Sequence, residues 1–185
     1  MEPFVTKDGR EIPLRAVGLR YVQMIMDRTA IPDVPTYTAE TVAGDVEVHK
    51  HVVKRDRDGK LVGTTLQSDE DWAEWNAYEQ ARSDALAKRM QDAITFLMCE
   101  CVQVDPPDEW AWSVDFEGWG MEPPEIPEDP RQRKLFWIEN ELLPDSDDLT
   151  ALTARLYVIG GIVGEDQAKN LESFFRLAVA RLSAG

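Results

Sequence analysis

The chain has 185 residues, of which 43% are hydrophobic, and it carries a formal net charge of −15 at pH 7. This length permits one well-buried core, and the sequence shows neither an apolar run of the ~18–20 residues that a membrane-spanning helix needs nor the basic and apolar start of a secretory signal. All of the excess negative charge falls in residues 66–185, which disfavours binding to nucleic acid or to an anionic membrane.

Residues 1–66 are predicted to form a small N-terminal part with two β-hairpins and one helix. The first hairpin spans residues 4–12, because Asp8-Gly9 tolerates the positive φ angles of a tight turn. A helix is predicted to begin at Pro13, since apolar residues follow at 3.6-residue spacing. Its inward face would comprise Leu14, Val17, Tyr21, Met24 and Ile25.

The second hairpin is predicted to follow a proline-rich connector. The prolines within residues 31–37 end the preceding helix and favour an extended chain. Valines alternate with polar residues over 46–52, a turn is expected at 55–60, and residues 61–66 would form the returning strand.

One face of this hairpin is a weak candidate for a metal site. Glu47, His49 and His51 point the same way on a strand, because alternate residues share a face. Two histidines and a carboxylate can bind zinc or iron, but no further ligand is identifiable. The interpretation as a solvated strand face is favoured, and neither a metal nor another cofactor is expected.

The strongest helix signal in the chain begins after Ser68, which is a suitable N-cap. Three acidic residues, 69–71, follow in the first turn and complement the helix dipole. One apolar stripe then runs for roughly 30 residues, so a spine helix about 45 Å long is predicted. The stripe comprises Trp72, Trp75, Tyr78, Leu86, Met90, Ala93, Ile94, Leu97 and Cys101.

The two cysteines, Cys99 and Cys101, are interpreted as core residues. Residues two apart on a helix point about 160° away from each other, so the pair is poorly placed to hold one metal ion. Free cysteine is commonly buried. Two closely spaced thiols form no disulfide framework, which favours a reducing, cytoplasmic compartment.

Three further helices are predicted in the C-terminal third. Asp129 caps the first and Pro130 begins it, with Leu135, Ile138 and Leu142 inward. Ser146 is expected to cap the second, which ends at Gly160-Gly161. The last spans 165–182.

The fold class is therefore mainly α (α+β), a helical domain with one long spine helix behind a small N-terminal part of two β-hairpins. The predicted domains are residues 1–66 and an acidic helical domain, 67–185. The second contains an internal acidic and aromatic connection at 104–129.

This connection is the best candidate for a surface that meets another molecule. No lysine or arginine occurs between Met90 and Pro130, yet the stretch holds 11 acidic residues and three tryptophans. Tryptophan is enriched at binding hot spots but also pins irregular loops to a core, so we expect the three to divide between anchoring and contact. The candidate partner-binding residues are Trp110, Trp112, Phe116, Trp119, Trp137, Asp108 and Glu109.

The sequence contains no signature of catalysis. There is no Gly-rich phosphate loop, no GxSxG elbow and no HExxH motif, and both histidines lie on one strand. The acidic runs 56–58 and 145–148 resemble calcium loops only superficially, because neither continues into the 12-residue pattern. They are interpreted as a turn and a helix start, and the protein is not expected to be an enzyme.

Three segments carry a family resemblance. TKDGREIPLRAV (6–17), PDVPTY (32–37) and KLFWIENELLPDSDDLTALTARLYVIGG (134–161) resemble small proteins of the tail-gene region of tailed bacteriophages and prophages. Within that group the chain is most similar to tail assembly chaperones, which bind the tape-measure protein or other tail components. The resemblance implies a non-enzymatic protein of the bacterial cytoplasm or the virion, either chaperone-like or a minor tail component, with a protein partner and with self-association open.

An alternative from the residues alone is an acidic mimic of nucleic acid that inhibits a DNA-binding protein. Such a mimic would place carboxylates at phosphate-like spacing. In this chain six prolines and three tryptophans interrupt the acidic residues between 104 and 130, which argues against a regular row.

Overall fold

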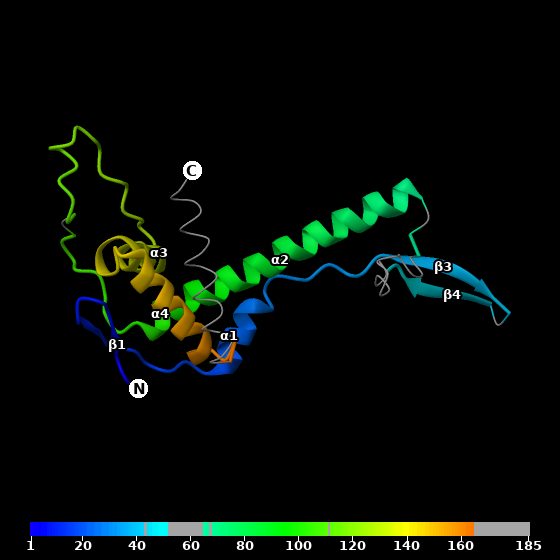
Figure 1. Cartoon of the computed structure of the whole chain (residues 1–185), viewed down its shortest axis with the longest axis horizontal. Coiled ribbons are helices and arrows are strands. Elements are labelled where there is room, and N and C mark those ends of the chain that lie inside the picture. Colours follow the sequence, from blue (N-terminus) through cyan, green and yellow to red (C-terminus); the bar gives the residue numbers. More distant parts are fainter. Residues whose placement is uncertain (43, 52–64, 67, 111, 165–185) are drawn as a thin grey trace, which may run out of the picture. The chain divides into compact units, whose positions relative to one another are not determined.

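The computed structural model describes residues 1–42, 44–51, 65–66, 68–110 and 112–164. It confirms the predicted fold class, a mostly helical chain with one long helix and two small antiparallel two-strand sheets near the N-terminus (Figure 1). In chain order the elements are β1 (Phe4–Val5), β2 (Glu11–Ile12), α1 (Leu19–Met26), β3 (Thr36–Thr41), β4 (Gly44–His49), α2 (Asp69–Cys101), α3 (Pro130–Trp137), the π-helix η1 (Ile138–Leu142) and α4 (Ser146–Ile159).

The chain divides into two compact units. The first comprises Met1–Met26 together with the described residues from Gln91 onwards, and the second comprises Asp27–Met90. Helix α2 runs through both units, because its first two thirds belong to the second and its C-terminal part belongs to the first. The predicted ranges 1–66 and 67–185 do not follow this division, since β1, β2 and α1 group with the C-terminal helices.

The first hairpin is confirmed, but the helix predicted from Pro13 begins only at Leu19. Leu14 is buried and extended, and it forms an isolated antiparallel bridge with Val102. The residues at the end of α2 therefore supply the backbone hydrogen bonds that residues 13–15 would otherwise form within a helix. Two hydrogen bonds complete this pairing, from Arg15 N to Cys101 O at 2.9 Å and from Gln103 N to Pro13 O at 3.0 Å.

The later start also changes which face of α1 is buried. Val22 is the buried residue of this helix, whereas Tyr21 and Met24, which were predicted to face inward, are exposed. The predicted stripe was wrong because it counted helical turns from Pro13, and residues 13–18 are not helical.

Strand β4 pairs with β3. The returning strand predicted over 61–66 lies mostly outside the described residues, although His51 N donates to Thr65 Oγ1 at 2.8 Å and Thr65 N donates to His51 O at 3.3 Å. Thr36 lies opposite His49 and Thr41 opposite Gly44. The predicted connector thus continues directly into a strand whose alternating threonines favour extended structure. Gly44 has a φ of 113°, which glycine adopts readily, and so it closes the tight turn. The turn predicted at 55–60 lies outside the described residues.

The spine helix is confirmed as α2. Asp71 N donates to Ser68 Oγ and Ser68 N donates to Asp71 Oδ2, both at 3.1 Å, so the two residues cap the helix reciprocally. Burial increases toward the C-terminal end, where six side chains are buried: Ala93, Ile94, Leu97, Met98, Cys99 and Cys101. Along the first two thirds, Trp72, Trp75 and Tyr78 are half-buried and Leu86 is exposed.

Within the second unit a buried lysine joins the strand end to the start of α2. Lys50 follows β4, and its Nζ lies 2.7 Å from an Asp71 oxygen and 2.5 Å from a Glu74 oxygen. The hydrogen bonds to Asp71 and then Glu74 raise the pKa of Lys50 above its usual value. A buried lysine needs such carboxylate partners, because an unpaired buried charge is costly.

Both cysteines are buried, as the core interpretation predicted. Burial raises the pKa of Cys101 to about 11 and also raises that of Cys99. The Cys99 thiol lies 3.5 Å from the carbonyl oxygen of Arg131, to which it donates.

We expect neither thiol to react in the folded protein. At pH 8 a thiol with a pKa of about 11 is ionised to roughly one part in a thousand, and burial denies access to the remainder. Treatment with Ellman's reagent should label no cysteine in native buffer and both in 6 M guanidinium chloride. Rapid labelling of either thiol in native buffer would contradict the packing described for the end of α2.

The C-terminal helices begin at aspartate caps. Asp129 accepts from Arg131 N at 3.0 Å and Gln132 N at 2.9 Å, with Pro130 in the first turn, as predicted. Helix α4 is capped by Asp145 and not by Ser146, because the Asp145 side chain reaches Asp147 N and Asp148 N.

Helix α4 ends at Gly160-Gly161, as predicted. A Cβ at Gly160 would lie 2.8 Å from Leu97 Cδ1, so glycine allows α4 to approach α2 closely. Gly161 has a φ of 65°, which glycine tolerates at the end of a helix. The helix predicted over 165–182 lies outside the described residues.

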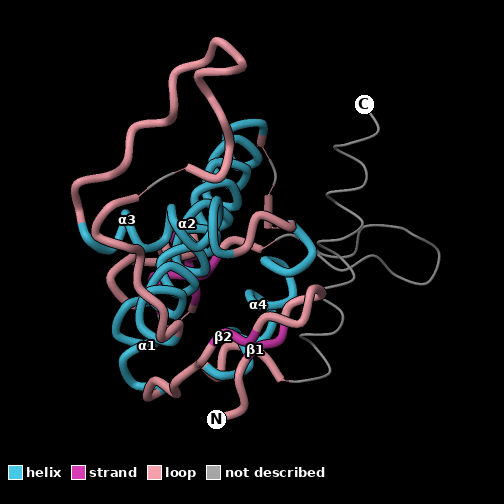
Figure 2. Tube along the Cα trace, turned by 90° about the vertical axis from the view of Figure 1, so that its left-hand side faces the viewer, coloured by secondary structure: helices cyan, strands magenta, loops and turns pink. Residues whose placement is uncertain are grey.

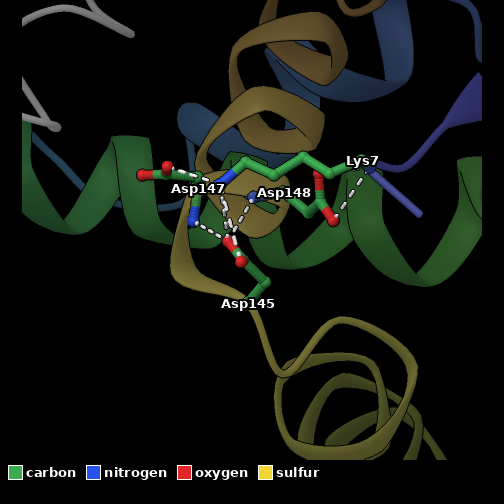
Figure 3. A network of polar contacts seen from close by, with 4 residues as sticks. All are labelled: Lys7, Asp145, Asp147 and Asp148. Atoms are coloured by element: carbon green, nitrogen blue, oxygen red, sulfur yellow. Dashed lines mark hydrogen bonds and ion pairs between the residues drawn. The ribbon is translucent and has the colours of Figure 1, made fainter.

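A polar network joins the first hairpin to the start of α4, beside which it lies in Figure 2. The backbone N of Lys7 donates to both carboxylate oxygens of buried Asp148, at 3.1 and 3.3 Å (Figure 3). Lys7 Nζ pairs with Asp147 at 2.5 Å and with Asp145 at 3.2 Å. The carboxylates of this acidic run therefore bind the chain's own N–H groups and Lys7, consistent with its interpretation as a helix start.

Replacing Asp148 should destabilise the fold measurably. In Asp148→Ala the Lys7 N–H loses the acceptor of a partly buried hydrogen bond, which is expected to lower the free energy of unfolding by about 1 kcal/mol. Asp148→Asn keeps one acceptor oxygen and should lose less. Urea denaturation followed by circular dichroism measures both variants, and unchanged stability of Asp148→Ala would contradict this role.

Candidate partner-binding site

The connection between α2 and α3 contains no helix or strand in its described part (Figure 2). Its first half is nevertheless held by an aromatic cluster, which we define as Trp110, Trp112, Phe116 and Phe136. Trp112 lies at the centre, with ring centroids 5.2 Å from Trp110, 5.4 Å from Phe116 and 5.8 Å from Phe136. The contacts with the two phenylalanines are edge-to-face, an arrangement that favours aromatic pairs.

Helix α3 supplies the cations that the connection lacks. Lys134 Nζ lies 2.8 Å from an Asp105 carboxylate oxygen and donates to Val102 O at the same distance. Arg133 donates to the carbonyl oxygens of Asp108 at 3.1 Å and Pro107 at 3.4 Å. We call residues 105–109 the base of the connection. The base is thus held by hydrogen bonds to its backbone as well as by an ion pair.

A further tie comes from η1. The carboxylate of Glu141 accepts from the backbone N of Ser113, at 3.2 and 3.3 Å. This bond lies directly beyond Trp112, so the chain is fixed on both sides of the packed ring. Together these contacts hold residues 105–110 and 112–116 against α3 and η1.

The tip of the connection is a compact turn. Phe116 O accepts from Trp119 N at 3.1 Å and from Met121 N at 2.9 Å, and Asp115 accepts from Gly118 N at 2.9 Å. Gly120 has a φ of 65°, which lets the chain reverse directly after Trp119. The turn is therefore ordered by its own hydrogen bonds.

The three tryptophans differ sharply in burial. Trp110 and Trp112 are half-buried in the aromatic cluster, whereas Trp119 is 77% exposed. Val114 and Met121, on either side of the turn, are 48% and 53% exposed. The structure thus places two tryptophans as anchors and presents the third to solvent.

An open hollow of about 640 Å³ lies beside this turn. Aromatic rings, aliphatic side chains and carboxylates line it together. Its lining is Trp112, Ser113, Val114, Asp115, Phe116, Glu117, Met121, Glu122 and Pro123. We call this hollow, together with exposed Trp119, the tip surface.

Other predicted site residues lie apart from the tip surface. Asp108 and Glu109 are exposed at the base of the connection, and Trp137 is half-buried on α3. Among the described residues the ring contacts join Phe136 to the connection, not its neighbour Trp137. Phe136 was not predicted, although it too lies off the Leu135–Ile138–Leu142 stripe and so was free to pack elsewhere.

Among the described residues, the weak metal candidate gains no further ligand. Glu47 and His49 lie exposed on β4, where Glu47 accepts from Thr36 Oγ1 at 2.7 Å, and His51 lies exposed beyond the strand. Within the described ranges no three His, Cys, Asp or Glu side chains gather closely enough to hold a metal ion.

Comparisons with protein-family models, with curated proteins and with solved structures find no match for this chain. In the part of the chain that the structure describes, no helix combines the length and the apolar character needed to cross a bilayer. The function must therefore be inferred from the chemistry of the tip surface and the aromatic cluster.

The division of the tryptophans predicts that substituting Trp112 destabilises the fold and that substituting Trp119 hardly does. Trp112→Ala removes the central ring of the cluster and should lower the free energy of unfolding by about 2 kcal/mol or more. Phe136→Ala should act in the same direction. Trp119→Ala should change stability by no more than about 0.5 kcal/mol, because this side chain is exposed.

Thermal unfolding followed by circular dichroism measures these effects, and fluorescence adds a second readout. Loss of Trp119 should remove an emission component at long wavelength, typical of a solvated indole. Equal destabilisation by Trp112→Ala and Trp119→Ala would contradict the division into anchor and exposed residues.

Proposed function

We propose that this protein is a non-enzymatic protein of the tail-gene region of a tailed bacteriophage or prophage, and that it binds another tail component during assembly. The tape-measure protein is the favoured partner. The observation that carries the binding role is Trp119, an exposed tryptophan on an ordered turn whose base is pinned to α3. The phage assignment is supported by the resemblance of segments 6–17, 32–37 and 134–161.

The exposed surface of Trp119 is large enough to matter for binding. An aromatic side chain such as tryptophan buries about 150–250 Å², and Trp119 is 77% exposed, so about 25 cal/mol per Å² gives a gross gain of roughly 3–5 kcal/mol. A gain of that size corresponds to about a thousandfold in affinity, before the entropic cost of ordering the binding surface is subtracted. The ordered turn reduces the ordering cost, because its backbone is already fixed.

An assembly role accounts for the combination of charge and apolar surface. A chaperone must hold apolar client segments reversibly, which requires a hydrated body and a few apolar anchors. The net charge of −15 keeps the body hydrated, and the tip surface supplies the apolar anchors. On this proposal the protein acts in the bacterial cytoplasm, or in the virion if it remains bound.

The nucleic-acid mimic is less well supported. Asp105 is paired with Lys134, so it would not be free to imitate a phosphate. The carboxylates at the tip are interleaved with aromatic and aliphatic side chains rather than arranged in a row.

Binding to the tape-measure protein encoded in the same gene region tests the proposal. We expect the wild-type protein to bind it in calorimetric titration and Trp119→Ala to bind at least tenfold more weakly, as expected for a hot spot. Tyr21→Ala is the matched control, because Tyr21 is an aromatic side chain, 61% exposed, on α1.

Two results would overturn the proposal. One is the absence of binding by the wild-type protein together with normal tails after deletion of its gene. The other is an equal loss of affinity in Trp119→Ala and Tyr21→Ala, which would remove the tip surface as the contact.

A further inference from the structure

The tip surface combines two kinds of groups that select the same kind of partner. Trp112 and Phe116 present aromatic rings to the hollow, 5.4 Å apart, and Val114 and Met121 add aliphatic surface. Asp115, Glu117 and Glu122 add three carboxylates to the same lining. Aromatic rings attract cations through their electron-rich faces, and carboxylates attract them through charge.

No cation of the described chain neutralises these carboxylates. The sequence has no lysine or arginine between Met90 and Pro130, and ion pairs among the described residues involve none of the three. Of the next cations along the sequence, Arg133 and Lys134 bind the base of the connection and line a different hollow, with Asp105 and Glu128. Arg131 takes part in none of the ion pairs among the described residues. The tip surface therefore keeps its negative charge.

We infer that the partner segment that docks on the tip surface is basic and apolar, and that it places a lysine or arginine side chain in the hollow while its apolar residues cover Trp119. This inference rests on the proposed binding function and adds the chemical class of the partner. A long cationic side chain matches both parts of the lining, because its methylene stem packs on apolar surface while its head meets carboxylates. A guanidinium or ammonium group can also lie over an aromatic face.

Other occupants fit the surface less well. An acidic segment would meet three like charges, and a second copy of this chain would bring its own acidic tip and a net charge of −15. A neutral apolar segment could cover Trp119 but would leave the carboxylates unpaired against it. Charge complementarity thus selects the basic partner.

Three synthetic peptides test this inference on the full chain. They share one amphipathic helical sequence with a leucine face, and only the flanking positions differ, carrying Lys and Arg, Gln, or Glu. Fluorescence anisotropy of labelled peptide measures the affinities at 50 and 300 mM salt. The basic peptide should bind at least tenfold more tightly than the neutral one at low salt, the acidic peptide should bind most weakly, and salt should narrow the difference.

Charge variants localise the effect. Glu117→Gln with Glu122→Gln removes two charges from the hollow and should abolish most of the preference for the basic peptide while keeping affinity for the neutral one. Glu125→Gln with Glu128→Gln is the matched control, because it removes two charges from exposed residues of the same connection that do not line the hollow. This control should keep the preference.

Each other outcome overturns the inference. These outcomes are no binding of the basic peptide up to about 1 mM, equal affinity for basic and neutral peptides, or equal effects of the two charge variants, which would indicate the overall charge of the chain. Equal affinities that still depend on Trp119 would leave the proposed function intact. Failure of the tape-measure protein to bind together with normal tails after gene deletion, but with a localised preference for the basic peptide, would overturn the proposed function alone.

Discussion

The buried C-terminal end of α2 is the constraint on which the first unit depends. The last carbonyl groups of a helix have no donors within it, and a buried end must find them elsewhere. Here Arg15 donates to the Glu100 and Cys101 oxygens, and Lys134 donates to that of Val102. The donors come from segments far apart in the sequence. Satisfying one helix end therefore brings the N-terminal strand segment and α3 to the same place.

The position of α3 then decides how the acidic connection is ordered. The connection has no cation of its own, so its charges repel and only groups outside it can bind it. Arg133, Lys134 and Phe136 all lie on α3, and they hold the base through carbonyl groups, one carboxylate and the tryptophan rings. The tip turn is fixed mainly by its own hydrogen bonds, one of them to the Asp115 side chain, and Phe116 links the turn to the aromatic cluster. The turn can therefore be ordered while Trp119 is exposed, because the hydrogen bonds that fix the turn do not involve the Trp119 side chain.

Local signals were readable from the sequence and distant pairings were not. Ser68 and Asp129 cap their helices through atoms within three residues, and Gly160-Gly161 ends one through backbone geometry, so each was predictable. The bridge from Leu14 to Val102 depends on a partner that no local pattern indicates. The exposure of Trp119 could not be predicted for the same reason. The connection has no periodic hydrophobic pattern, so its sequence does not indicate which tryptophan rings pack against Phe136.

The acidic residues at the tip also limit which surfaces can cover the exposed tryptophan. A solvated indole beside Val114 and Met121 is a site for non-specific association, since any apolar surface could cover it. Three carboxylates around the same hollow make that approach unfavourable for neutral surfaces, which must desolvate them, and for acidic ones, which they repel. A basic segment alone removes both obstacles. On the proposed function, the charge therefore contributes selectivity and Trp119 contributes affinity, and a variant that lacked only the carboxylates would bind more partners rather than fewer.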